Sequence, residues 1–253
     1  MLKLVNAGLL LLATVTAGCV NDDVAIDPEK AYCEIFEGAT RFGCGVLVGA
    51  SNNGKTTIAV LTARHVVTGC NGDMMTIKVK RHNEMVALDL DNDIGSRWQT
   101  IDDAAVDSAW LVLNQNEVKK SGHLCYAPII NNINNYQEIN QRTSVRLGEE
   151  SVQRQYLAYT NNITMPFPLN TIMKSADIRG GIISGITEVS QSGSPVFTLD
   201  DAGKVDQLLG TSTGSNADKN ITIFMTIADI HDALYGSLTG KNAALLMNLR
   251  KFW

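Results

Sequence analysis

From about residue 42 onward, the chain is a succession of short apolar or alternating runs separated by turn signals. The run Gly43–Gly49 is followed by the run Thr56–Ala63, and Asn53-Gly54 between them is typical of a tight hairpin, because both residues tolerate positive φ. Further strands are predicted at Met74–Lys80, Glu84–Leu88, Ser108–Leu113, Ser144–Leu147, Ser151–Tyr159, Gly181–Glu188, Pro195–Leu199, Val205–Thr211 and Ile221–Met225. Many short strands with almost no long helical period indicate an all-β barrel or sandwich protein.

Helical character is confined to the end of the chain. The segment Ile227–Leu234 is predicted to be a helix, and the later sequence NAALLMNLRKF also has helical character. The segment Asn131–Gln141 is rich in Asn and Gln and lacks a clear period. We interpret this segment as a linker between two halves of the strand-rich region.

One stretch within the first hairpin matches a nucleotide-binding pattern. The sequence Gly49–Thr56 fits the phosphate-binding loop pattern G-x-x-x-x-G-K-[ST], which requires a helix directly after the loop. Instead, the β-branched residues Thr56, Thr57 and Ile58 favour a strand there. We therefore predict no bound nucleotide and no cofactor; the alternative, an NTPase, predicts nucleotide binding that depends on Lys55.

The composition is that of a globular protein, with 45% hydrophobic and 19% charged residues. The formal net charge is −5 and no long basic run is present, so the chain lacks the electrostatic footprint of a nucleic-acid-binding protein. Aromatic residues make up only 6%, which also disfavours a stacking surface for single strands. Nucleic acid is therefore not an expected partner.

The N-terminus has the pattern of an export signal. Residues 1–18 combine a basic start, a short apolar run and small residues, too short for a membrane-spanning helix. The sequence Thr16–Cys19 resembles a bacterial lipobox, which implies a lipid on Cys19 as the mature N-terminus, and Val20 favours the outer membrane. We expect an outer-membrane lipoprotein of the bacterial envelope, facing periplasm or exterior, with residues 19–30 as a polar tether and the lipid as its only membrane contact.

Four further cysteines lie in the predicted exported part. They are Cys33, Cys44, Cys70 and Cys125. An even number of cysteines in an exported chain suggests disulfides, and four cysteines allow three pairings. Their spacing fits no common zinc site, so no metal is expected.

Three short motifs carry the candidate chemistry. They are LTARHVV (Leu61–Val67), which contains His65, VDSAWLVL (Val106–Leu113), which contains Asp107, and SQSGSPVF (Ser190–Phe197), which contains Ser192. The three motifs resemble the histidine, aspartate and serine motifs of chymotrypsin-like (trypsin-like) serine proteases, particularly the bacterial ones. Their order along the chain is also the order in that family. The resemblance covers about residues 40–235.

The resemblance implies a particular architecture for residues 31–253. The expected fold is two six-stranded antiparallel β-barrels with a short C-terminal helix. The N-terminal barrel would span about residues 31–130 and the C-terminal barrel about 140–225, with a helical segment at 226–253.

The resemblance also implies a serine endopeptidase that acts on proteins or peptides. Ser192 would be the nucleophile, His65 its general base and acid, and Asp107 the group that orients His65. A serine hydroxyl needs such a base near neutral pH, and the base needs a carboxylate to fix its tautomer. The backbone N–H groups of Ser190 and Ser192 would form the oxyanion hole and stabilise the tetrahedral intermediate.

One departure from the family pattern concerns the oxyanion hole. Ser190 stands where the family usually has glycine, which adopts backbone angles that a residue with a Cβ adopts at a cost. The alternative hypothesis is therefore a catalytically weak or inactive binding module on the same fold.

Two further expectations follow from the resemblance. The substrate pocket would be lined by Ile186, Thr211 and Thr213, which define no cleavage specificity. A Cys44–Cys70 disulfide would brace the histidine loop, as a similar bridge does in the family, which leaves Cys33 to pair with Cys125.

Overall fold

A computed structural model describes residues 24–52, 55–81, 83–91, 94–101, 103–130, 144–166, 175–236, 249 and 252. The predicted signal peptide, the lipidation residue Cys19 and the linker Asn131–Gln141 lie outside the described residues. Most of the last predicted helical segment lies outside them as well.

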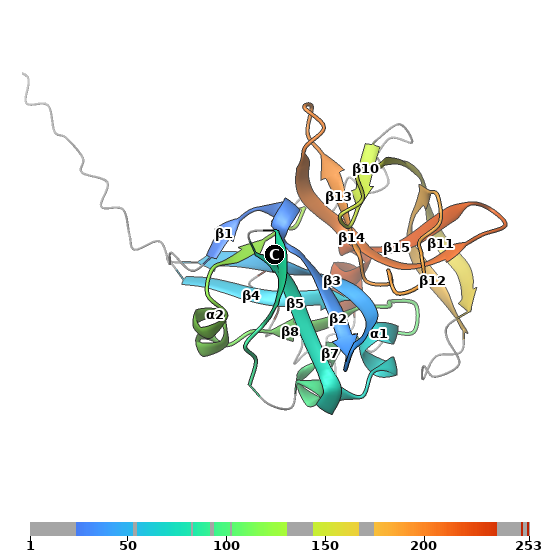
Figure 1. The fold of residues 1–253 in the computed structure, drawn as a ribbon. Coiled ribbons are helices and arrows are strands. Elements are labelled where there is room, and N and C mark those ends of the chain that lie inside the picture. The colour runs from blue at the N-terminus through green and yellow to red at the C-terminus, as the bar shows by residue number, and fades with distance from the viewer. Residues whose placement is uncertain are drawn as a thin grey trace, which may run out of the picture.

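The first half of the chain forms a seven-stranded antiparallel sheet with the order β6-β5-β2-β3-β4-β8-β7 (Figure 1). Its strands are β2 (Tyr32–Glu37), β3 (Thr40–Asn52), β4 (Lys55–Thr62), β5 (Met75–Arg81), β6 (Glu84–Ala87), β7 (Gln99–Thr100) and β8 (Ala109–Val112). Strands β3 and β4 form the predicted hairpin, with Asn52 opposite Lys55. A strand therefore follows Lys55, and the helix that a phosphate-binding loop requires is not there.

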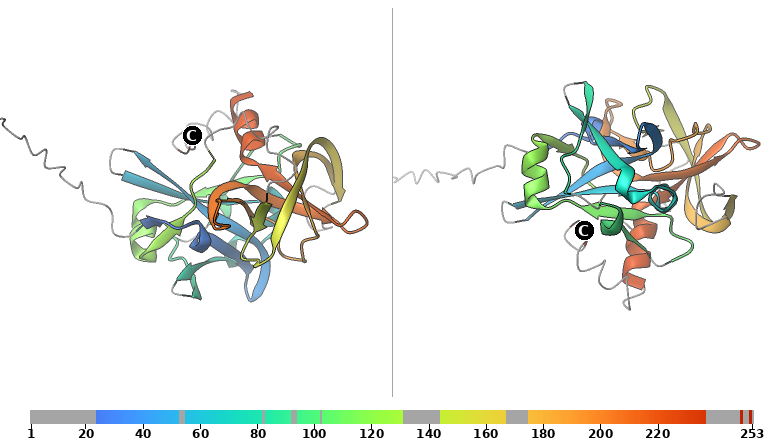
Figure 2. Two further views of the ribbon diagram at one scale, coloured as in Figure 1. Left: turned by 90° about the horizontal axis from the view of Figure 1, so that it is seen from above. Right: turned by 60° about the horizontal axis from the view of Figure 1, so that its bottom comes forward.

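The second half forms a closed antiparallel barrel with the order β10-β11-β12-β15-β14-β13. Its strands are β10 (Ser144–Leu147), β11 (Gln153–Pro166), β12 (Ser175–Ser184), β13 (Pro195–Leu199), β14 (Val205–Asn216) and β15 (Ile221–Thr226). Helix α3 (Ile227–Gly236) follows β15 directly and packs on β14 and β15 (Figure 2).

Among the described residues, two short helices and three 3-10 turns connect the strands of the first half. Helix α1 (Arg64–Gly69) follows β4, and α2 (Gln115–Ser121) lies at the end of the first sheet that is remote from the barrel (Figure 1). Single 3-10 turns occur at Pro28–Lys30, Gly72–Met74 and Gly95–Arg97.

The folded part begins earlier than the sequence predicted. Strand β1 (Val24–Ile26) pairs in parallel with β9 (Leu124–Tyr126), and Val24 is buried in the core of the first sheet. The predicted tether of residues 19–30 is therefore wrong from residue 24 onward, because this segment gains backbone hydrogen bonds and an apolar contact.

The central strands of the first sheet are buried on both faces. On β4, Ile58 and Val60 belong to the core of the first sheet, whereas Ala59 and Leu61 belong to a second core. That second core also contains Trp110 of β8, the barrel interior and the apolar residues of α3. Since successive side chains point to opposite faces of a strand, the near-continuous apolar runs in the sequence reflect this double burial.

The predicted all-β fold class is confirmed, with one difference in detail. The C-terminal barrel is a closed ring of six strands with a short helix after it, as predicted, whereas the N-terminal half is a seven-stranded sheet. Within the part of the chain that the structure describes, no helix is long and apolar enough to cross a membrane. No cluster of potential metal ligands occurs among these same residues.

Candidate active site

The pairing of β4 with β8 brings two of the predicted catalytic residues together. These strands are antiparallel neighbours, and Thr62 at the end of β4 lies opposite Ala109 at the start of β8. His65 comes three residues after Thr62, and Asp107 comes two residues before Ala109. Both residues therefore lie at the same end of the strand pair.

Asp107 makes two hydrogen bonds to His65. Its Oδ1 accepts the backbone N–H of His65 at 3.0 Å, and its Oδ2 lies 2.6 Å from His65 Nδ1. Both residues are buried, with 5% of His65 and none of Asp107 exposed. Because a carboxylate only accepts hydrogen bonds, this contact places the ring proton on Nδ1 and leaves Nε2 as an acceptor.

The same carboxylate also completes the start of α1. The residue before that helix, Ala63, has no side-chain group that could accept a hydrogen bond from the free N–H groups of the first turn. Asp107 Oδ1 supplies this acceptor from the segment just before β8, and its charge suits a helix N-terminus. Asp107 therefore fixes both the backbone and the ring of His65.

Ser192 lies on a turn that packs against the strands leading to His65. Its carbonyl accepts a hydrogen bond from Cys44 N on β3 at 2.8 Å, and Gly193 N donates to the carbonyl of Ser212 on β14 at 2.7 Å. A Cβ on Gly43 would meet both the Val66 side chain at 2.6 Å and the Ser192 carbonyl at 3.0 Å. The Ser192 backbone thus lies beside α1, the helix that carries His65.

Gly193 makes this close packing possible. Its φ is +84°, and a Cβ there would lie 2.1 Å from the Cys44 carbonyl oxygen and 2.2 Å from Thr62 Oγ1. Both atoms are fixed, since Thr62 Oγ1 donates to the Cys44 carbonyl at 2.5 Å. Only glycine satisfies the backbone angle and the space at this position.

Replacement of Gly193 by alanine is expected to destabilise the protein by about 3 kcal/mol, because a strained φ and a backbone clash act together. The matched control is Gly203→Ala. Gly203 has φ +76°, but its nearest atom is the flexible Gln153 Nε2 at 3.3 Å, so a loss of about 1 kcal/mol is expected. Urea unfolding measures both, and equal losses would contradict this account of the turn.

The groups predicted for the oxyanion hole are not engaged elsewhere. Within the described residues, the N–H groups of Ser190 and Ser192 donate no hydrogen bond, and the Ser192 hydroxyl has no hydrogen-bond partner either. Ser190 has φ +67°, in the left-handed region. A residue with a Cβ held in this region typically costs about 1 kcal/mol or more.

Hydrogen bonds join the loop after Ile186 to β14, the strand that carries Thr211 and Thr213. Ser215 Oγ donates to the carbonyl of Thr187, and Ser212 Oγ donates to the carbonyl of Gln191. Of the predicted lining residues, Ile186 is 48% exposed, whereas Thr211 and Thr213 of β14 are buried. Among the described residues, the hydroxyls of these two threonines have no hydrogen-bond partner.

Arg154, which belongs to no functional motif, holds the segment around Ile186 in place. Its guanidinium forms a pair of hydrogen bonds with the Glu150 carboxylate, each 2.8 Å long. It also donates to the carbonyls of Ser184 and Ile186 and to the hydroxyl of Thr222. A lone arginine in a strand carries no sequence signal for such a role, which only the fold reveals.

Neither predicted disulfide is present, since all four cysteines are free thiols. Cys44 contacts Tyr32 Oη and the Ser190 carbonyl, on the face of β3 opposite the core against which Cys70 packs. Cys33 points into that core, whereas Cys125 lies between two core residues of β9 and points away from it. The disulfide prediction is therefore wrong, because alternation along the strands separates both pairs.

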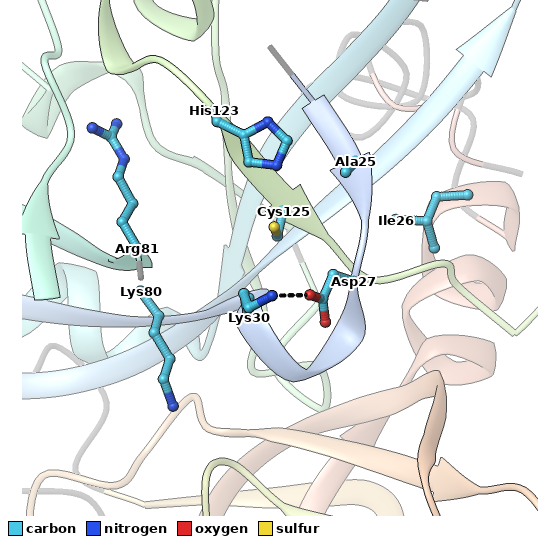
Figure 3. Close-up of a pocket in the computed structure, with 8 residues that line it drawn as sticks. All are labelled: Ala25, Ile26, Asp27, Lys30, Lys80, Arg81, His123 and Cys125. Atoms are coloured by element: carbon cyan, nitrogen blue, oxygen red, sulfur yellow. Dashed lines mark hydrogen bonds and ion pairs between the residues drawn. The ribbon is translucent and has the colours of Figure 1, made fainter. Parts of the chain in front are cut away.

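One hollow of the described surface lies away from this site. It encloses about 220 Å³ between β1, β5 and β9 and is lined by Ala25, Ile26, Asp27, Lys30, Lys80, Arg81, His123 and Cys125 (Figure 3). Lys30 and Asp27 form an ion pair there. None of the residues predicted to be catalytic lines this hollow.

Comparison with known proteins supports the fold. No protein-family model matches the chain, and no curated protein matches its sequence. The structure is similar to the active form of the Rv3671c protease from M. tuberculosis, with 16% identity, a TM-score of 0.51, and coverage of 86% of this chain and 92% of that chain. A catalytically inactive tobacco etch virus protease in complex with substrate shows 13% identity and a TM-score of 0.43, covering 88% of this chain and 85% of that chain. The similarity to the Rv3671c protease shows that the chain has the chymotrypsin-like fold.

Proposed function

We propose that this chain, with the fold of the chymotrypsin-like proteases, is a serine endopeptidase that hydrolyses peptide bonds. The main support is the buried contact between His65 and Asp107 beside the turn that carries Ser192. A histidine paired with a carboxylate can activate a nearby serine as a nucleophile when the serine hydroxyl makes no other hydrogen bond.

The proposed reaction has two stages. His65 Nε2 accepts the proton of Ser192 as its Oγ attacks the peptide carbonyl, and Asp107 stabilises the imidazolium that forms. The N–H groups of Ser190 and Ser192 bind the oxyanion of the tetrahedral intermediate. This intermediate collapses to an acyl-enzyme, and the amine leaves with the proton from His65. Water then hydrolyses the ester by the same steps, and Ser192 is regenerated.

A fluorophosphonate probe tests this proposal, because it reacts with serine only where a base and an oxyanion site activate the hydroxyl. We expect the folded full-length chain to acquire one adduct, located by peptide mass mapping on the tryptic fragment that contains Ser192. Heat-denatured protein is the control and should not react. Folded protein that stays unlabelled would contradict the proposal.

Such a negative result would favour the second candidate, a binding module that retains the protease fold. Two observations support it: Ser190 occupies a left-handed conformation in place of glycine, and no hydrogen bond joins the Ser192 hydroxyl to His65 in the described part of the chain. The second observation weighs less, because catalytic hydrogen bonds are often long before substrate binds.

We also propose that a lipid on Cys19 holds the protein in the bacterial envelope. This proposal rests on the sequence of residues 1–20 alone. The substrate, a protein or peptide, would then be met in the periplasm or outside the cell.

A further inference from the structure

Ser190, the strained residue of the proposed oxyanion hole, accepts a hydrogen bond from Arg41. Ser190 has φ +67°, and its side-chain Oγ accepts a hydrogen bond from Arg41 Nε at 3.2 Å. Arg41 belongs to β3, in the first half of the chain, whereas Ser190 lies between β12 and β13 of the barrel. The contact therefore links the two halves at the turn that would bind the oxyanion.

Arg41 is itself held in place. Its Nη1 donates to Glu34 Oε1 at 2.8 Å across the β2–β3 pair, and both side chains are partly buried. The hydrogen bond that Arg41 donates to the Glu34 carboxylate raises the pKa of Arg41, so the guanidinium remains charged. Because Nε and Nη1 belong to one rigid planar group, the contact with Glu34 fixes the direction in which Nε points at Ser190.

A second contact holds the backbone of Ser190 from the same side. The Cys44 thiol donates to the Ser190 carbonyl at 3.3 Å, and Cys44 Sγ also lies 2.9 Å from Tyr32 Oη. Burial raises the pKa of Cys44, which keeps the thiol protonated and able to donate. Side chain and carbonyl of Ser190 are thus both bound by groups of β3.

We propose that Arg41 is a positioning residue that holds Ser190 in its left-handed conformation and thereby aims the oxyanion-binding N–H groups. A glycine at this position would adopt the same angles without help. Unlike glycine, Ser190 has a hydroxyl that the Arg41 guanidinium can bind. Ser190 and Arg41 together therefore do what a glycine would do alone at this position. The inference rests on the proposed function of this site and adds a residue to it.

The test is a double-mutant cycle on the rate of fluorophosphonate labelling, with wild type, Arg41→Ala, Ser190→Gly and the double variant. In the presence of Ser190, loss of Arg41 is expected to slow labelling about tenfold, as for a hydrogen bond to a charged group. In the Ser190→Gly background the same loss should change the rate less than about twofold. Equal slowing in both backgrounds, or no slowing with Ser190 present, would overturn the proposal.

Arg97→Ala is the matched structural control. Arg97 is exposed to a similar extent as Arg41 and pairs with the buried Glu117, but it lies between β6 and β7. This variant should lower the Tm and leave the labelling rate unchanged. If it slows labelling as much as Arg41→Ala does, the effect of Arg41 is one of general stability and the proposal fails.

A readout that needs no activity separates this inference from the proposed function. The three-bond HN–Hα coupling of Ser190, measured by NMR, reports its φ in wild type and in Arg41→Ala. We expect the coupling to change in the variant, and an unchanged coupling would overturn the proposal. If wild type is not labelled at all, the proposed function fails, while the coupling still decides whether Arg41 holds Ser190.

Discussion

Replacement of Ser192 by alanine is expected to lower kcat/KM for a cleaved peptide on the order of a million-fold. Alanine has no hydroxyl, so no acyl-enzyme forms and only substrate binding and the oxyanion site contribute to any remaining rate. A peptide-library cleavage profile of the wild type supplies the substrate, and initial rates of both proteins provide the comparison.

Ser194→Ala is the control for that measurement. Ser194 lies in the same turn, but it is 3% exposed and its side chain contacts Cys44. Its backbone hydrogen bonds to Gln191 and Ser212 do not involve the side chain and would persist. A loss in Ser194→Ala that matches the loss in Ser192→Ala would show that the nucleophile has been assigned wrongly.

Replacement of Asp107 by asparagine is expected to lower kcat about 10,000-fold. If the asparagine oxygen keeps accepting the backbone N–H of His65, its NH₂ group faces Nδ1 and forces the ring proton onto Nε2. Nε2 can then no longer accept the proton of Ser192. In the other orientation the NH₂ group faces the backbone N–H, so two donors oppose each other in a buried site.

Asp103→Asn is the matched control for Asp107→Asn. Asp103 is four residues away, pairs with Arg179 and is partly exposed, so Asp103→Asn should change kcat less than about twofold. Circular dichroism and Tm establish that both variants are folded. Asp107→Asn with a kcat within tenfold of wild type would mean that another group orients His65.

Most strands were predictable because their signals are local. Strands β10 and β13 occupy the predicted ranges at Ser144–Leu147 and Pro195–Leu199. The first alternates polar and apolar residues, and the second is a mostly apolar run that begins after a turn. The β3–β4 hairpin followed from Asn53-Gly54, although that dipeptide lies outside the described residues.

The elements that were missed depend on tertiary contacts. Helix α1 contains two valines and a threonine, which have low helix propensity, and it begins where Asp107, from the segment before β8, accepts the N–H group of His65. Strand β1 is only three residues long and exists because β9 offers an edge to pair with. No window of local sequence contains either partner.

The residues of the candidate site also fall into those with a local sequence signal and those whose role depends on tertiary contacts. The residue types at His65, Asp107 and Ser192 suggested their roles, and the order of β4 and β8 explains how two of them meet. The role of Arg41 could not be predicted, because it depends on the φ of Ser190 and on a side chain 149 residues away along the chain. The disulfide prediction failed since spacing alone does not show which face of a strand a cysteine occupies.

The backbone hydrogen bond from Cys44 to Ser192 has a consequence for the timing of activity. It joins the first sheet to the barrel, and the turn that it holds is also bound to β14, which comes later in the chain. A copy still emerging during synthesis contains His65 and Asp107 before Ser192 and β14 have been made. If the chain is a protease, completion of the fold switches it on, and unfinished copies do not digest one another.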